Sequence, residues 1–157
     1  MTLHTFYSNV SRMLLSDLPE ASEILAKNVD DIPPSTRSIT HEVLDWSAPL
    51  ALHIRETRWD LVLVADCTYN PSTTPHLVST LRGVAEGGGQ AGAATMVLLA
   101  MKVRHDSEMV CFDMLAEVEF VVREKIALEV PTLPTEADEE IEVFLLTLKP
   151  PAEKAAQ

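Results

Sequence analysis

Five consecutive apolar residues, Leu61 to Ala65, form the most restrictive feature of this 157-residue sequence. A strand that is covered on both faces is apolar throughout, whereas a half-exposed strand alternates apolar with polar residues. The run therefore predicts a parallel strand in a sheet between two layers of helices. It stops abruptly at a polar segment that starts with Asp66 and ends with Asn70-Pro71, two residues that favour turns.

Strand and helix patterns alternate along the rest of the chain. The predicted elements, in order, are strand 12–16, a helix from Pro19, strand 39–44, a short helix in 49–57, strand 61–65, a helix from Thr74, strand 95–101, a helix that Ser107 can cap, and strands 120–130 and 141–148. Alternation of this kind is typical of an α/β, Rossmann-like, doubly wound sheet. Two successive strands at the end predict an antiparallel C-terminal hairpin.

Composition narrows the class of protein. The 24 acidic and 12 basic residues give a net charge of -12, which repels phosphate backbones and argues against nucleic-acid binding. No apolar run approaches the roughly 18 residues of a membrane span, and the N-terminal segment is a poor signal peptide. The cytoplasm is the expected compartment, with the nucleus as the alternative.

The cysteines and histidines give no sign of a metal centre. The two cysteines, Cys67 and Cys111, lack the spacing of a disulfide framework or a four-cysteine zinc site. The five histidines are scattered without the spacing of metal ligands. We therefore expect no metal, and we interpret both cysteines as packing residues.

All five glycines lie between Gly83 and Gly92. A phosphate or nucleotide loop needs glycines after a strand and before a helix. The glycines at 87–89 instead follow a predicted helix and precede a strand. We therefore expect no glycine-rich cofactor loop in the residues before 83.

Polar residues follow three of the predicted strands, where ligands bind in open α/β sheets. They are Asp17, the pair Asp45 and Trp46, and the pair Asp66 and Tyr69. Each has a structural alternative: Asp17 as a helix N-cap, Trp46 as a buried indole, and residues 66–71 as a turn that closes the strand. Trp59, which precedes the buried strand, is interpreted as a packing residue.

Two segments carry a resemblance to a known family. LLSDLPEASEILAKNV and WDLVLVADCTYN resemble the second- and fourth-strand segments of the seven-β-strand methyltransferases of family 16, which modify protein lysines. The Asp-x-x-Tyr mark of that family is here Asp66-Cys67-Thr68-Tyr69. The resemblance implies a partial class I methyltransferase domain at 13–149, between a non-family segment at 1–12 and a tail at 150–157.

The chain also departs from that family. Family members have a first strand and a glycine-rich loop directly before the segment that begins here near Met13. Residues 1–11 contain neither a glycine nor an acidic residue that could replace them. We therefore expect a sheet that is incomplete at its N-terminal side, with unpaired ladder groups where the inner strand is missing.

The resemblance implies S-adenosylmethionine as the cofactor and a protein lysine as the methyl acceptor. It places Asp17 at the ribose, Asp45 and Trp46 at the adenine, and Ala65 at the cofactor. It assigns Asp66 and Tyr69 to catalysis. The acidic surface favours a basic protein partner. Two alternatives stay open: a non-catalytic protein-binding module that kept the fold, and a small-molecule methyltransferase.

Overall fold

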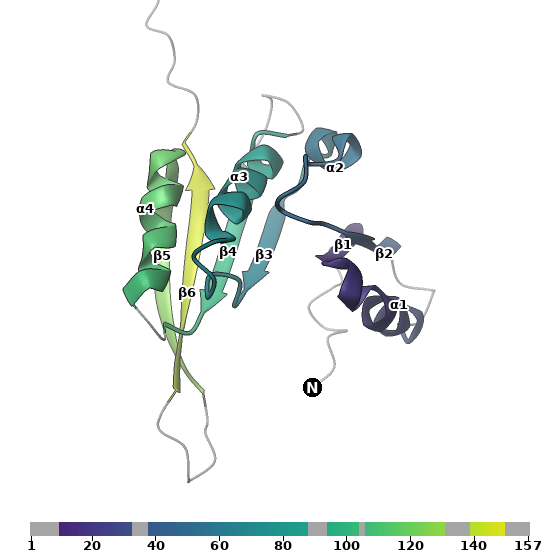
Figure 1. The fold of residues 1–157 in the computed structure, drawn as a ribbon, viewed down its shortest axis with the longest axis horizontal. Coiled ribbons are helices and arrows are strands. Elements are labelled where there is room, and N and C mark those ends of the chain that lie inside the picture. Colours follow the sequence, from purple (N-terminus) through teal and green to yellow (C-terminus); the bar gives the residue numbers. More distant parts are fainter. Residues whose placement is uncertain (1–9, 33–37, 88–93, 104–105, 131–138, 150–157) are drawn as a thin grey trace, which may run out of the picture. The chain divides into compact units, whose positions relative to one another are not determined.

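The computed structural model describes residues 10–32, 38–87, 94–103, 106–130 and 139–149. The chain divides into two compact units, Met1–Ala48 and Pro49–Gln157, and each is described by itself. Figure 1 shows the elements of both. Among the helices of the described ranges, none combines the length and the hydropathy that crossing a membrane requires.

The first unit is a strand–helix–strand motif. Its elements are β1 (Arg12–Asp17), the short η2 (Pro19–Ala21), α1 (Ser22–Asp30) and β2 (Ser38–Val43). The strands pair in parallel, from Arg12 opposite Ser38 to Asp17 opposite Val43. Pro19 opens the helical segment as predicted, because its fixed φ suits a first turn and its missing N–H is not needed there. Ile24, an apolar residue of α1, is 61% exposed, so this helix does not bury all of its apolar side chains.

The second unit holds a four-stranded sheet and three helices. Its elements are α2 (Leu52–Glu56), β3 (Leu61–Ala65), α3 (Thr74–Ala85), β4 (Met96–Met101), η3 (Asp106–Met109), α4 (Val110–Glu117), β5 (Phe120–Val130) and β6 (Glu139–Leu148). The strand order is β3-β4-β6-β5, with β3 parallel to β4 and β6 antiparallel to both of its neighbours. The α/β class and the antiparallel C-terminal hairpin are therefore confirmed.

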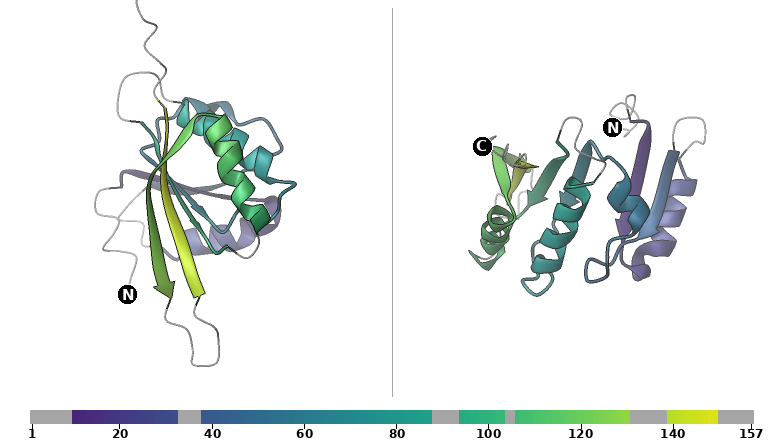
Figure 2. Two further views of the ribbon diagram at one scale, coloured as in Figure 1. Left: turned by 90° about the vertical axis from the view of Figure 1, so that its left-hand side faces the viewer. Right: turned by 90° about the horizontal axis from the view of Figure 1, so that it is seen from above.

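The core of the second unit lies on one face of this sheet. The described helices α3 and α4 lie on the same side of the strands (Figure 2). Alternate residues of the central strands are buried beneath them: Val97, Leu99, Met101, Phe144 and Leu146. The helices contribute four residues of α3 and one of α4: Leu77, Val78, Leu81, Val84 and Leu115. Alternation along the strands thus places one set of side chains inside, as the period of two requires.

The prediction that β3 is buried on both faces is wrong for the described part of the chain. Val64 is buried, but Leu61 and Leu63 are 45% and 65% exposed. The unbroken apolar run is typical of a strand that is covered by helices on both faces. The described helices of this unit cover only one face of β3 (Figure 2). In the described ranges β3 also pairs only with β4, and β1 pairs only with β2, so one edge of each has no described partner strand.

Candidate functional site

Asp66, the residue directly after β3, has an unusual backbone conformation. Its amide donates a hydrogen bond of 2.8 Å to the carbonyl oxygen of Ala100, which continues the β3–β4 ladder by one residue. Its φ is +50°, in the left-handed region that few residues other than glycine adopt. The chain therefore leaves the sheet sharply at Asp66, and the side chain of this aspartate is exposed.

The turn that follows is held by Asn70. The Oδ1 atom of Asn70 accepts hydrogen bonds from the amide and the hydroxyl of Ser72, and its carbonyl oxygen accepts from the amides of Thr73 and Thr74. These bonds start α3. The structural interpretation of Asn70 as a turn residue is therefore correct.

Thr68 anchors the middle of this segment, which the sequence analysis did not single out. Its side chain is buried, with Oγ1 3.8 Å from the sulfur of Met101 at the end of β4. Tyr69, the next residue, is 66% exposed. In the segment 66–69, Thr68 therefore packs into the core, while Asp66 and Tyr69 are exposed to solvent. A single threonine among polar residues gives no sequence signal for this role.

The candidates of the first unit follow its two strands directly. Oδ1 of Asp17 accepts a 2.7 Å hydrogen bond from the amide of its neighbour Leu18. The N-cap position of η2 is Leu18 and that of α1 is Ala21, so Asp17 is not the N-cap of either. Its carboxylate is exposed at the carboxyl end of β1.

Asp45 and Trp46 lie at the carboxyl end of the neighbouring strand. Oδ1 of Asp45 accepts from the amide and the hydroxyl of Ser47, at 2.8 and 2.7 Å, so this aspartate shapes a tight turn. Trp46 is half-buried. The amide of Leu44 donates to the carbonyl oxygen of Asp17 at 2.9 Å, which places the ends of both strands side by side. Asp17, Asp45 and Trp46 therefore gather at one edge of the first unit.

Of the three residues interpreted as packing residues, Cys111 is buried, whereas Trp59 and Cys67 are half-buried and the thiol of Cys67 donates to the carbonyl oxygen of Ala65 at 3.1 Å. The indole N–H of Trp59 donates to the carbonyl oxygen of Ile54 at 3.0 Å, and the hydroxyl of Thr95 donates to the Trp59 carbonyl at 2.7 Å. Cys111 is buried, and burial raises the pKa of its thiol to about 11. Among the described residues, no three His, Cys, Asp or Glu side chains are grouped so that they could hold a metal ion.

Taken together, each unit places its polar candidates where strands end. The first unit carries Asp17, Asp45 and Trp46, and the second carries Ala65, Asp66 and Tyr69. Strand ends of open α/β sheets are where such folds bind ligands. The antiparallel final hairpin beside parallel strands, with polar residues at the strand ends, agrees with the Rossmann-like methyltransferase fold that the sequence resemblance implies.

Solved structures of that class share the fold. An S-adenosylmethionine-dependent methyltransferase from Methanosarcina mazei aligns with a TM-score of 0.57 and 10% identity, over 94% of this chain and 97% of the other. One from Clostridium acetobutylicum gives 0.61 and 11%, over 93% and 79%. A methyltransferase from Pyrococcus furiosus gives 0.53 and 11%, over 91% and 68%.

The family itself is identified by sequence. Residues 1–118 match the family model described as lysine methyltransferase, Methyltransf_16. The chain belongs to this family, as its two strand segments indicate. No curated protein sequence matches it.

Proposed function

We propose that this chain catalyses the transfer of a methyl group from S-adenosylmethionine to a lysine side chain of a protein. The observation that carries the proposal is the segment Asp66–Tyr69, which stands directly after β3 with Asp66 and Tyr69 exposed and Thr68 buried between them. Membership of a family described as lysine methyltransferase supports the choice of acceptor.

The edge of the first unit suits the adenosine part of the cofactor. A ribose presents two hydroxyl donors, and the exposed carboxylate of Asp17 is a charged acceptor for them. The half-buried indole of Trp46 offers a ring face for adenine, and Asp45 offers a carboxylate for its exocyclic amine. Ala65, the last residue of β3, is exposed and has no bulk to block a ligand.

Asp66 and Tyr69 are assigned to the acceptor lysine. Bound S-adenosylmethionine supplies an activated methyl group on a sulfonium. Attack needs a neutral amine held in line, so orientation and exclusion of water are the main contributions of the protein. The carboxylate of Asp66 positions the incoming ammonium but also favours its charged form, so it is a positioning group and not a strong base. The exposed ring of Tyr69 presents a face for the amine.

The charge of the chain supports a basic protein substrate. A net charge of -12 attracts cationic segments over several ångströms and raises their encounter rate at low salt. We propose the cytoplasm, or the nucleus as the alternative, as the compartment in which such a substrate is met.

A non-catalytic protein-binding module is the second candidate. The sequence has no glycine before Gly83, so residues 1–82 contain no glycine-rich loop that could bring its backbone close to the cofactor. In the described residues, β1 and β3 also belong to separate sheets. Both observations favour a chain that keeps the fold and binds S-adenosylmethionine weakly.

Two measurements test the proposal and separate the candidates. The first is methyl incorporation from labelled S-adenosylmethionine into a mixture of basic peptides, with matched peptides in which arginine replaces lysine as the control. Incorporation that depends on lysine and falls in Asp66→Asn supports the proposal. Incorporation that persists in the arginine peptides contradicts the lysine assignment. The second is binding of the same peptides without cofactor, because tight binding with no incorporation favours the module.

A further inference from the structure

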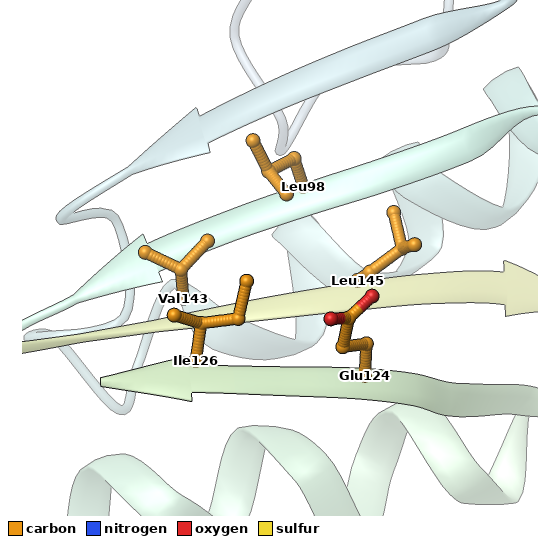
Figure 3. A pocket seen from close by; sticks show the side chains of 5 residues that line it. All are labelled: Leu98, Glu124, Ile126, Val143 and Leu145. Atoms are coloured by element: carbon orange, nitrogen blue, oxygen red, sulfur yellow. The ribbon is translucent and has the colours of Figure 1, made fainter. Parts of the chain in front are cut away.

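Met101, the last residue of β4, places a buried sulfur atom at the carboxyl edge of the four-stranded sheet. Leu98 of the same strand lies on the face drawn in Figure 3, where it lines a shallow hollow with side chains of β5 and β6. Side chains alternate between the two faces of a strand, and Met101 stands an odd number of positions after Leu98. Met101 therefore points to the face that α3 and α4 cover (Figure 2), and a group that reaches its sulfur has to enter the core.

Thr68 places its hydroxyl group against this sulfur. Its Oγ1 atom lies 3.8 Å from the sulfur of Met101, and Thr68 is 1% exposed. A thioether sulfur is only a weak acceptor, so this contact compensates poorly for the removal of the hydroxyl from water. Valine has almost the same shape and carries no hydroxyl. Packing alone therefore favours valine at this position, and the hydroxyl has to be explained by something other than stability.

The backbone is held on both sides of Thr68. Before it, the amide of Asp66 donates to the carbonyl oxygen of Ala100 at 2.8 Å. After it, the side chain and the carbonyl oxygen of Asn70 accept the hydrogen bonds that start α3. Tyr69 stands between Thr68 and Asn70, yet it is 66% exposed. An exposed ring on a backbone that is already ordered can bind a ligand with little further loss of entropy.

We propose that Thr68 is a positioning residue for the acceptor lysine, because the contact of its hydroxyl with the Met101 sulfur fixes the direction of the Tyr69 ring. The inference rests on the proposed function, which assigns Tyr69 to the acceptor. Thr68 is buried, so it does not touch the substrate and acts through its exposed neighbour. A hydrogen bond depends on direction as well as distance, which the contact of a valine methyl does not. The hydroxyl therefore selects one arrangement of the turn.

The first test is a double-mutant cycle on the full 157-residue chain. Binding of a basic peptide that contains lysine is measured by fluorescence anisotropy, with a matched arginine peptide as the control. We expect Thr68→Val to weaken binding of the lysine peptide about fivefold, and Thr68→Ser, which keeps the hydroxyl, to stay within about twofold of the wild type. In a Tyr69→Ala background Thr68→Val should have no further effect, because a positioning residue acts through the residue that it positions.

Thermal unfolding separates this role from a purely structural one. We expect Thr68→Val to unfold at or above the temperature of the wild type, because it removes a buried hydroxyl that has only a weak acceptor. A structural role predicts the opposite, a loss of binding that accompanies a loss of stability. Met101→Leu is the matched variant on the other side of the contact, since it keeps the apolar volume and removes the sulfur. It should weaken binding as Thr68→Val does, and the two changes together should weaken it no more than either alone.

Three results would overturn the role of Thr68. They are binding by Thr68→Val as tight as that of the wild type, an undiminished effect of Thr68→Val in the Tyr69→Ala background, and a lower unfolding temperature of Thr68→Val. Each leaves the proposed function standing, because that function requires only that Tyr69→Ala weaken binding of the lysine peptide. A wild type that binds the lysine peptide no better than the arginine peptide contradicts the proposed acceptor, and the role of Thr68 with it.

Discussion

The amide of Asp66 donates a 2.8 Å hydrogen bond to the carbonyl oxygen of Ala100, although Asp66 itself has a φ of +50°. The last ladder bond between β3 and β4 is therefore made by a residue that already turns away from the sheet. Aspartate and asparagine tolerate this left-handed conformation better than other non-glycine residues, and β-branched residues tolerate it least. The backbone thus restricts which side chains can stand at this strand end.

From this restriction we expect Asp66→Asn to change the free energy of unfolding by less than about 0.5 kcal/mol, and Asp66→Val to lower it by about 1–2 kcal/mol. Glu119, with φ +71°, is the matched control outside the candidate site. Glu119→Gly should raise stability by about 0.5–1 kcal/mol. Urea denaturation of the four proteins measures this. Equal stability of the Asn and Val variants would show that the left-handed turn does not persist in solution.

Replacing Gly83, inside α3, or Gly87, just after it, with alanine should have different effects on stability. A Cβ atom at Gly87 would collide with the backbone carbonyl of Arg55, whereas one at Gly83 would lie 3.1 Å from a side-chain methyl of Leu50. A backbone atom cannot move aside as a leucine rotamer can. We expect Gly87→Ala to destabilise by about 1–3 kcal/mol, and Gly83→Ala, inside the helix, to be neutral or stabilising by up to about 1 kcal/mol. Thermal unfolding checks both, and a Gly87→Ala protein as stable as the wild type would contradict the close approach.

Cys111 should make stability fall at alkaline pH. Burial raises the pKa of its thiol from 9.0 to about 11, so the folded chain holds this proton more tightly than the unfolded chain. The resulting stabilisation is complete below about pH 9 and is lost as the pH rises to about 11. Urea unfolding from pH 8 to pH 11 should show a decline steeper by about 2 kcal/mol in the wild type than in Cys111→Ala. Parallel declines would mean that the thiol is not buried in solution.

The 157-residue chain should bind S-adenosylmethionine weakly. No residue before Gly83 is a glycine, so residues 1–82 contain no glycine-rich loop. They therefore cannot supply the backbone contacts that such a loop makes with the methionine moiety of S-adenosylmethionine. Calorimetry on the purified chain should give a dissociation constant well above the low micromolar range, where binding is worth roughly 7–8 kcal/mol. Low micromolar affinity would show that other residues supply those contacts, and would argue against the binding-module alternative.

Substitutions of Asp17 and Asp66 should affect different steps, cofactor binding and methyl transfer, in a form of the protein in which a strand and a glycine-rich loop precede Met13. Asp17→Asn should weaken cofactor affinity by about 1.5–3 kcal/mol, because it removes a charged acceptor proposed to bind the ribose. Asp66→Asn should mainly slow single-turnover methylation, because it removes the group proposed to aim the amine.

Calorimetry and single-turnover kinetics on both variants make this comparison, and Asp113→Asn, exposed on α4, is a control for loss of an aspartate elsewhere. Equal loss of affinity with an unchanged single-turnover rate would contradict the acceptor role of Asp66. The segment Asp66–Tyr69 would then be a structural turn alone.

The sequence by itself determined the order and type of the elements in the described ranges. The apolar run at 61–65 predicts a strand. Local backbone preferences make Pro19 a helix start and Asn70-Pro71 a turn. The spacing of Leu77, Val78, Leu81 and Val84 places them on one face of α3, and all four are buried. These signals act over a few residues, so no distant contact is needed to read them. The Asp-x-x-Tyr mark belongs with them, and it led to the family that the comparison confirms.

Only the tertiary structure decided which faces those elements cover. Leu63 and Val64 are equally apolar in sequence, yet one is 65% exposed and the other 6%, because helices α3 and α4 lie on one side of the sheet. The same holds for Thr68, whose buried hydroxyl lies 3.8 Å from the sulfur of the distant Met101, and for the left-handed turn at Asp66. Burial is a property of what lies opposite a side chain, and that neighbour is usually remote in the chain. The apolar pattern of the sequence therefore indicates which side chains could be buried. The packing of helices against the sheet determines which of them are buried.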